Sequence, residues 1–238
     1  MKYTIDARVR YSEIDHRGTL TLPGIINYFQ DCSTFQSEDI GYGVMRLKER
    51  KKAWVLSYWQ IIVDRYPKMG ERICVGTFAT AFKRIIGERN FFLDDEAGNH
   101  LARAASVWVY MDVERGRPTR PGDDEMNAYG REEPLDMPYE DRKIALPTEC
   151  RPCEPFAVKR CHIDTNEHVN NCQYVQMAME EIQTESIIRQ VRVEYKKSAV
   201  LGDIVHPFIA KEDERTVVEL RDGEGNVYAV VEFQMASE

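Results

Sequence analysis

Residues 93–102 read LDDEAGNHLA, and residues 220–229 read LRDGEGNVYA. In each stretch a cluster of Asp, Gly and Asn separates two apolar runs, and this pattern predicts a β-hairpin with a tight turn. Because the same hairpin pattern occurs once in each half of the chain, the sequence indicates an internal repeat.

Three further pairs of segments match in the same order along the chain. They are the approach to a predicted helix, the helix itself, and a turn that precedes a strand. Apolar residues recur at helical spacing in both helices, so each helix has one strongly apolar face. Four landmarks in one order predict a duplicated structural unit. The pairs are residues 14–15 (ID) with 163–164 (ID), 25–36 with 174–185, and 68–71 (KMGE) with 200–203 (VLGD).

The first half predicts one strand, one long helix and then four strands in an antiparallel meander. Thr21 supplies a capping hydroxyl and Pro23 favours the first turn, so the helix should begin there and end near Gly41. The predicted strands alternate in polarity or are rich in β-branched and aromatic residues. They cover residues 3–12, 54–63, 72–82, 85–93 and 100–112.

A unit of one long helix and one meander predicts the α+β class. The helix buries its apolar face only if it lies across the concave face of a curved sheet, and one such sheet leaves an open edge. Two units joined edge to edge would remove that edge and leave a groove between the helices. We expect a first unit at residues 1–130, a proline-rich linker at residues 131–150 and a second unit at residues 151–238.

Composition limits the classes of function. The chain has 238 residues, a net charge of −8 and 43% hydrophobic residues. The acidic balance argues against a nucleic-acid partner. No apolar run reaches the roughly 18 residues of a membrane span, and residues 1–10 lack the layout of a signal peptide, so we expect a soluble, cytoplasmic protein. The basic residues between positions 46 and 52 are expected to form a solvated helix face.

The six cysteines are expected to be free thiols. Cys150 and Cys153 form a CxxC pair, but a zinc site needs a second close pair and the remaining spacings are irregular. The sequence therefore predicts no metal ion and no cofactor.

Asp164, Asn166 and His168 stand at alternate positions just before the second predicted helix. On an extended segment the three polar side chains would point to one side, beside the N-terminus of that helix. A carboxylate, a carboxamide and an imidazole placed there can activate water and stabilise negative charge. A structural alternative remains, because Asp and Asn are also common helix caps.

These residues belong to the motif IDTNEHVNN at residues 163–171, and the chain also contains WVLSYWQIIVDRYP at residues 54–67 and ASVWVYMD at residues 105–112. With the duplication, these motifs resemble the double hotdog acyl-acyl carrier protein thioesterases of plants and bacteria. The resemblance covers nearly the whole chain. It implies a tandem hotdog, with two long helices, each wrapped by a curved antiparallel sheet, and the two sheets joined into one. It also implies hydrolysis of fatty acyl-acyl carrier protein thioesters in fatty-acid biosynthesis.

The resemblance assigns catalytic residues. Asp164, Asn166 and His168 fall on the family's Asp, Asn and His, with Asp164 as the base for water or as the direct nucleophile. In plant members a Glu and a Cys follow the sequence EYRR, whereas here Ser198 and Ala199 follow EYKK. Ser198 can hold a water molecule but cannot act as a base at neutral pH, and a Cys nucleophile is excluded.

The first half lacks this set, because Arg17 and Thr19 stand where Asn166 and His168 would be. We therefore expect one catalytic site per chain, in the second half. Backbone N–H groups at residues 169–171 would form its oxyanion hole.

The remaining expectations concern the substrate and its carrier. Apolar side chains of the first-half helix and strands would line an acyl pocket, although each is more readily explained as core. Acyl carrier protein is acidic, so basic residues near the site would dock it. A homodimer is also compatible with the fold. The residues are Ile26, Phe29, Trp59, Phe91 and Asn171 for the substrate, and Lys196, Lys197 and, more weakly, Arg84 for the carrier protein.

Two alternatives stay open. The chain could hydrolyse coenzyme A esters by the same chemistry, because single-hotdog thioesterases share the motif that begins at Asp164. It could also bind acyl groups without catalysis, because the Glu of the plant family members is missing.

Overall fold

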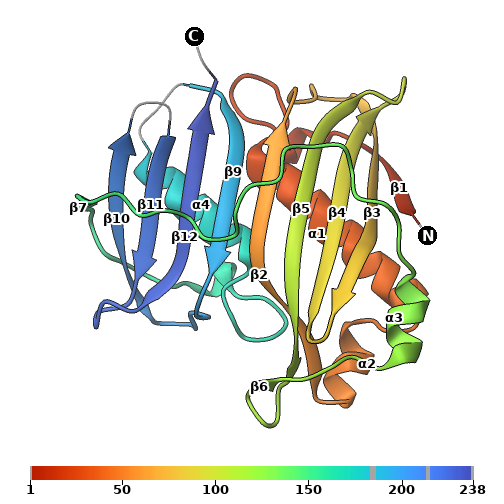
Figure 1. The fold of residues 1–238 in the computed structure, drawn as a ribbon. Helices are drawn as coiled ribbons and strands as arrows, with labels where there is room; N and C mark the ends of the chain where they lie inside the picture. The colour runs from red at the N-terminus through yellow and green to blue at the C-terminus, as the bar shows by residue number, and fades with distance from the viewer. Residues whose placement is uncertain (1, 183–185, 213–214, 237–238) are drawn as a thin grey trace. The chain divides into compact units, whose positions relative to one another are not determined.

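Two compact units make up the computed structural model, which describes residues 2–182, 186–212 and 215–236. The first unit contains the residues up to Ser57 together with Ile61–Tyr139, and the second contains Tyr58–Gln60 together with the residues from Glu140 onward. Each unit is built from one long helix and one antiparallel sheet (Figure 1).

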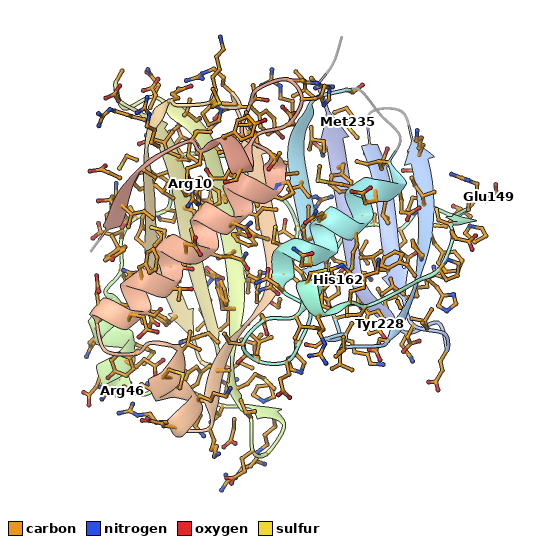
Figure 2. All side chains as sticks on the ribbon, turned by 180° about the vertical axis from the view of Figure 1, so that it is seen from behind. Arg10, Arg46, Glu149, His162, Tyr228 and Met235 are labelled. Carbon is orange, nitrogen blue, oxygen red and sulfur yellow. The ribbon has the colours of Figure 1, made fainter. Side chains whose placement is uncertain are left out.

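In the first unit, helix α1 (Leu22–Asp39) lies along one face of the sheet (Figure 1, Figure 2). The strand order is β1-β3-β4-β5-β2, and the short β6 pairs with β5. The other elements are β1 (Tyr3–Arg8), the 3₁₀ turn η1 (Tyr11–Glu13), α2 (Val44–Glu49), β2 (Lys52–Val63), β3 (Arg72–Lys83), β4 (Ile86–Asp95), β5 (His100–Asp112), β6 (Arg117–Pro118) and α3 (Asp123–Tyr129).

The predicted helix is confirmed as α1. The Thr21 hydroxyl accepts a hydrogen bond from the Gly24 N–H (3.1 Å), which caps the N-terminus as the sequence indicated. Ile25 and Cys32 are fully buried on the face toward the sheet. Gly41 follows the helix with a φ of 77°, a left-handed conformation that favours glycine.

The predicted four-strand meander is wrong for its first strand. β3, β4 and β5 do form a meander, but β2 lies beyond β5 in the strand order instead of next to β3. The reason is that β1 pairs with β3 along its whole length, from Tyr3 with Thr77 to Arg8 with Arg72, while β4 occupies the other edge of β3. No edge of β3 is left for β2.

In the second unit, helix α4 (Asn171–Glu181) lies along one face of a sheet with the order β9-β12-β11-β10-β7, and β8 pairs with β10 (Figure 1). The second predicted helix is confirmed as α4, which begins beside Asn170 as expected, and residues 183–185 of the predicted range lie outside the described residues. The other elements are β7 (Arg151–Pro152), β8 (Phe156–Ala157), the 3₁₀ turn η2 (Arg160–His162), β9 (Ile188–Tyr195), β10 (Ile204–Glu212), β11 (Arg215–Arg221) and β12 (Val227–Met235).

The hairpins that suggested the duplication have the same geometry. The Asp95 N–H donates to the Asn99 C=O at 3.0 Å, and the Asp222 N–H donates to the Asn226 C=O at 2.8 Å. The glycine of each turn has a positive φ, 82° in the first unit and 89° in the second. The hairpin pattern in the sequence therefore reports a real structural repeat.

The turns at residues 68–71 and 200–203 also match. In each, the carboxylate of the last residue accepts the N–H of the first, Lys68 to Glu71 at 2.9 Å and Val200 to Asp203 at 3.0 Å. The third residue of each turn is a glycine with a φ of 79° or 88°. Glu71 and Asp203 thus make the same hydrogen bond in the two units, although their side chains differ in length.

The predicted linker packs closely on the sheets. In the first unit, the Asn90 side chain accepts hydrogen bonds from the Leu135 N–H (3.2 Å) and the Tyr139 hydroxyl (3.1 Å). In the second unit, Ile144 is 1% exposed and packs on Val217 and Val230. Figure 1 shows this segment crossing the face of each sheet that α1 or α4 does not cover. The linker therefore covers part of the second face of each sheet.

The basic stretch that was predicted to be a solvated helix face is only partly helical. Arg46 and Lys48 are exposed on α2, and Arg50 and Lys51 are exposed after its end, whereas Lys52 is half-buried at the start of β2 and pairs with Asp112 (2.9 Å). Within residues 2–182, 186–212 and 215–236, no helix is long and apolar enough to cross a membrane.

Candidate functional site

The residues from Asp164 to His168 form a tight turn, not an extended segment. The Asp164 N–H donates to the His168 C=O (2.8 Å), Ile163 pairs with Val169, and Glu167 has a φ of 63°. The predicted strand-like alternation of the three polar side chains is therefore wrong. The first unit forms the same turn from Asp15, so the duplicated fold imposes this conformation.

The Asp164 carboxylate holds this turn together. Its Oδ1 accepts the N–H of Asn166 (2.8 Å) and the N–H of His168 (3.4 Å). Asp15 accepts the N–H of Arg17 (2.9 Å) and the N–H of Thr19 (3.2 Å) in the same way. Asp164 therefore has a structural role, but in the turn and not as the helix cap that the sequence left open, because an Asp side chain that bonds to the backbone two residues on stabilises a turn. In the described part of the chain, Oδ2 of Asp164 accepts no hydrogen bond.

The turn is paired with the segment that contains Ser198. The Val169 N–H donates to the Ala199 C=O (2.9 Å), and His168 pairs with Val200. The side chains of Asn166, His168 and Ser198 are exposed, and among the described residues they form no hydrogen bonds with one another. The backbone thus brings the four predicted catalytic residues together, with three of the side chains open to a ligand.

The start of α4 adjoins this turn. Asn170 caps the helix by accepting the Cys172 N–H (2.9 Å), and its own N–H donates to the C=O of His162, which is labelled in Figure 2. The Val169 N–H already donates to the Ala199 C=O. Of the N–H groups at residues 169–171, Asn171 alone lacks a partner among the residues that the structure describes. The predicted oxyanion hole is thereby reduced to this one donor within that range.

The predicted docking lysines are both in ion pairs. Lys196 Nζ lies 3.1 Å from Glu194, and Lys197 Nζ lies 2.8 Å from Asp222. The Lys197 ammonium and the Asn226 side chain hold the pKa of Asp222 well below its usual value of 3.8. Arg84 is exposed in the β3–β4 turn of the first unit, with a φ of 59°. Lys196 and Lys197 therefore offer less free charge than the sequence suggests.

Two basic residues that the sequence analysis did not single out stand just before the turn in the chain. Lys159 and Arg160, at the start of η2, are both exposed. Neither has an ion-pair partner within the described ranges. The ArgCysHis turn directly precedes the Asp164 turn, so these cations stand beside the candidate site.

The predicted acyl-pocket residues are all closed off from solvent. Ile26, Phe29, Trp59 and Phe91 are each 0% exposed. The rings of Phe29 and Phe91 lie 5.3 Å apart between α1 and the sheet of the first unit. In this conformation they form core, and their role as pocket walls stays a prediction.

The cysteines are free thiols, as expected. Burial raises the pKa of the Cys172 thiol, on α4, to about 12, so it is protonated at neutral pH. No group of three or more His, Cys, Asp or Glu side chains that could hold a metal ion occurs among the residues that the structure describes.

Comparison with known proteins decides the family. Residues 1–129 match the acyl-ACP thioesterase N-terminal domain, and residues 147–235 match the acyl-ACP thioesterase C-terminal domain. The chain belongs to the acyl-ACP thioesterase family. Oleoyl-acyl carrier protein thioesterase 2 of Arabidopsis thaliana is 26% identical over 236 residues, which are 90% of this chain and 64% of the plant protein. The chain spans about 60% of the length of the curated plant relatives that it matches.

Solved structures of acyl-ACP thioesterases share the fold. The acyl-ACP thioesterase of Bacteroides thetaiotaomicron superposes with a TM-score of 0.89 at 24% identity, covering 99% of this chain and 98% of that protein. The 12:0-ACP thioesterase of Umbellularia californica gives a TM-score of 0.85 at 18% identity, covering 100% and 98%. The α+β tandem hotdog that the resemblance implied is confirmed.

In this chain, Glu194 does not replace the Glu that plant members of the family carry after EYRR. Side chains alternate along β9, so Glu194 shares a face with Arg192, whose guanidinium bonds to the linker carbonyl of Asp141 (3.0 Å). Tyr195, on the opposite face, reaches the first residue of α4. The Glu194 carboxylate therefore faces away from the Asp164 turn.

Proposed function

We propose that this chain hydrolyses fatty acyl-acyl carrier protein thioesters at the Asp164 turn of the second unit. Family membership supports the reaction class. The observation that carries the site assignment is the Asp164 carboxylate, which is held in the turn before α4 through Oδ1, while its Oδ2 accepts no hydrogen bond from the described residues. The corresponding turn of the first unit has Arg17 and Thr19 in place of Asn166 and His168, so we assign it no catalysis.

Thioester hydrolysis needs a nucleophile and a donor for the developing oxyanion. In one route, Oδ2 of Asp164 takes a proton from water as the oxygen of that water adds to the carbonyl carbon. In the other, Oδ2 adds to the carbonyl directly, and water then hydrolyses the mixed anhydride. In both routes the carbon–sulfur bond breaks and the thiolate leaves without an acid catalyst.

Four neighbouring groups complete the proposed site. The Asn171 N–H, at the positive end of the α4 dipole, is available to the oxyanion. Asn166 and His168 project from the turn and are positioned to orient the thioester and the water. Ser198 takes the place of the family Glu and is assigned a water-holding role, because a hydroxyl both donates and accepts.

The partner is acyl carrier protein, and we assign its docking to the exposed cations beside the turn. Lys159 and Arg160 have no neutralising carboxylate among the residues that the structure describes, and an otherwise acidic chain can attract an acidic partner only through a local basic surface. Lys196 and Lys197 remain candidates of lower weight because their charges are shared with Glu194 and Asp222.

The test is steady-state hydrolysis of a chain-length ladder of acyl carrier protein esters by wild type, Asp164→Asn and Asp15→Asn. An amide can still accept the turn hydrogen bonds through its oxygen, so both variants should fold. We expect kcat to fall about 10²- to 10⁴-fold for Asp164→Asn. The matched variant Asp15→Asn should keep the wild-type rate. Equal rates for all three proteins would remove Asp164 from the mechanism.

The Ser198 substitution favours a second candidate, an acyl-binding protein without turnover. Loss of a base at this position leaves a turn that can still hold a carbonyl group. Absence of hydrolysis with both carrier-protein and coenzyme A esters, together with tight retention of the acyl ligand, would support that candidate. Hydrolysis of coenzyme A esters in preference to carrier-protein esters in a competition assay would instead identify an acyl-CoA thioesterase.

A further inference from the structure

Two tyrosines distinguish the second unit from the first at positions next to the Asp164 turn. Tyr174 lies on α4 and Tyr195 ends β9, and their rings meet edge to face with centroids 5.8 Å apart. Both hydroxyl groups bond to the main chain around the candidate site. Neither residue belongs to the set that the family resemblance assigned.

The duplication shows what stands at these positions in the first unit. Tyr174 is four residues beyond the cap of α4, where α1 has Ile25. The two residues after Tyr195 donate to the Tyr228 C=O (2.9 and 3.2 Å), and the two residues after Val63 donate to the Leu101 C=O (2.9 and 3.1 Å). Ile25 and Val63 are therefore the structural counterparts, and both are apolar.

The Tyr174 hydroxyl satisfies a backbone group that the first unit does not have. It accepts the Ala199 N–H at 2.7 Å, and Ala199 is 0% exposed, so this N–H would otherwise be buried without a partner. The first unit has Pro67 at this place, which carries no N–H. In both units the C=O of this residue anchors the turn, since Ala199 accepts the Val169 N–H (2.9 Å) and Pro67 accepts the Leu20 N–H (2.8 Å).

Tyr195 acts on the other side of the turn. Its hydroxyl donates to the C=O of Asn171 at 3.0 Å, and Asn171 is the first residue of α4. Burial raises the pKa of Tyr195 well above its usual value of 10, so the hydroxyl keeps its proton at physiological pH. The same cause raises the pKa of Tyr174 to about 12.

We propose that Tyr174 and Tyr195 are positioning residues for the hydrolysis assigned above. Tyr174 holds the Ser198–Ala199 segment, and Tyr195 holds the helix start that carries the Asn171 N–H. Together they fix the water-holding group, the carboxylate and the oxyanion donor relative to one another. The inference rests on the proposed function for its effect on rate, but its structural part stands on the two hydrogen bonds.

The experiment compares Tyr174→Phe and Tyr195→Phe with the matched control Tyr28→Phe. Tyr28 is a buried tyrosine of α1 whose hydroxyl donates to the carboxylate of Glu13 (2.8 Å), the last residue of η1 in the first unit. We expect kcat on an acyl carrier protein ester to fall roughly 10- to 100-fold for Tyr174→Phe, with KM changed less than about twofold, since a small misplacement of reacting groups is costly. A smaller fall in kcat is expected for Tyr195→Phe, and none for Tyr28→Phe.

Amide hydrogen exchange gives a readout that does not depend on turnover. In Tyr174→Phe the amides of Val169 and Ala199 should exchange at least about tenfold faster, while the Leu20 amide of the first unit keeps its rate. If wild type hydrolyses no thioester, the proposed function fails, and exchange alone then decides the positioning role. Unchanged exchange at Val169 and Ala199 overturns that role, and so does an unchanged kcat in an active enzyme.

A rescue variant separates this hydrogen bond from general damage. Ala199→Pro introduces the residue that the first unit has at this position, Pro67, and a proline has no N–H that needs a partner. We expect Tyr174→Phe combined with Ala199→Pro to recover most of the lost kcat and the slow exchange of the Val169 amide. A double variant as slow as Tyr174→Phe would show that the loss does not come from the Ala199 N–H and would overturn the proposal.

Discussion

Glu232 offers the sharpest test of how the linker is held on the second unit. Its side chain is 1% exposed, and its Oε1 accepts hydrogen bonds from Arg192 (Nε at 2.8 Å, Nη2 at 2.7 Å). Its Oε2 accepts one from Arg215 at 2.8 Å. The same guanidinium groups donate to the linker carbonyls of Asp141 (3.0 Å) and Ala145 (3.3 Å). One carboxylate therefore holds both arginines that hold the linker.

The magnitude follows from the two arginines. Glu232→Gln keeps the shape of the side chain but removes its charge. The Arg192 side chain, which is 9% exposed, then keeps an ion pair only with Glu140, at 4.0 Å, among the described residues. Removing one partner of a buried ion pair costs about 3–5 kcal/mol. Arg215 is 28% exposed and keeps Glu212, so it adds little. We expect a loss of about 3 kcal/mol, at the low end of that range.

Urea unfolding of wild type, Glu232→Gln and the control Glu212→Gln measures this loss. Glu212 is 43% exposed, and a surface pair of this kind contributes less than about 1 kcal/mol. The Glu232 network lies on the linker side of the sheet, so kcat per folded molecule should stay at the wild-type value. A loss for Glu232→Gln no larger than that for Glu212→Gln would refute the reasoning.

Three further predictions concern acid stability, docking and helix capping. The Arg65 guanidinium lowers the pKa of Glu71 below its usual value of 4.5, so this carboxylate stabilises the fold above pH 4.5 and loses that effect as the pH falls below it. Glu71→Gln should therefore flatten the dependence of the urea midpoint on pH in this acid range. Charge reversal at Lys159 and Arg160 should raise KM for an acyl carrier protein ester several-fold at low salt and leave kcat unchanged, as measured by steady-state kinetics. Asn170→Ala removes the cap of α4 and should lower the free energy of unfolding by about 1 kcal/mol, as measured in urea.

Each of these predictions has a result that contradicts it. A pH profile of Glu71→Gln that superposes on wild type would contradict the pKa argument. If charge reversal at Lys196 and Lys197 raises KM more than reversal at Lys159 and Arg160, the assignment of carrier-protein docking to Lys159 and Arg160 is wrong. Thr21→Ala is the matched control for the cap, and a loss for Asn170→Ala well below that for Thr21→Ala would show that the Asn170 cap contributes little.

Local features of the fold could be predicted from the sequence because their causes are local. The turn glycines, the Thr21 cap and the apolar face of α1 each follow from residues within a few positions of one another. The position of β2 could not be predicted in this way. It depends on β1 taking the free edge of β3, which is a pairing between residues far apart in the chain.

The candidate site was predicted as a set of residues but not as a geometry. The spacing of Asp164, Asn166 and His168 fits a strand and a turn equally well, and strand alternation was the wrong choice. The corresponding segment of the first unit contained the missing signal. Gly18, with a φ of 75°, occupies the position of Glu167, and a glycine there indicates a left-handed turn residue.

The duplication separates what the fold requires from what the chemistry requires. Asp15 and Asp164 bond to the same backbone groups, so an aspartate at this position is needed for the turn and does not by itself identify a catalytic unit. Positions where the units differ carry more information, because the fold tolerates either residue there. Leu22 is 3% exposed at the start of α1, whereas Asn171, at the start of α4, accepts a hydrogen bond from the Tyr195 hydroxyl through its carbonyl. The polar substitutions in the second unit therefore surround the Asp164 turn, and it is this surrounding set that marks the turn as a site.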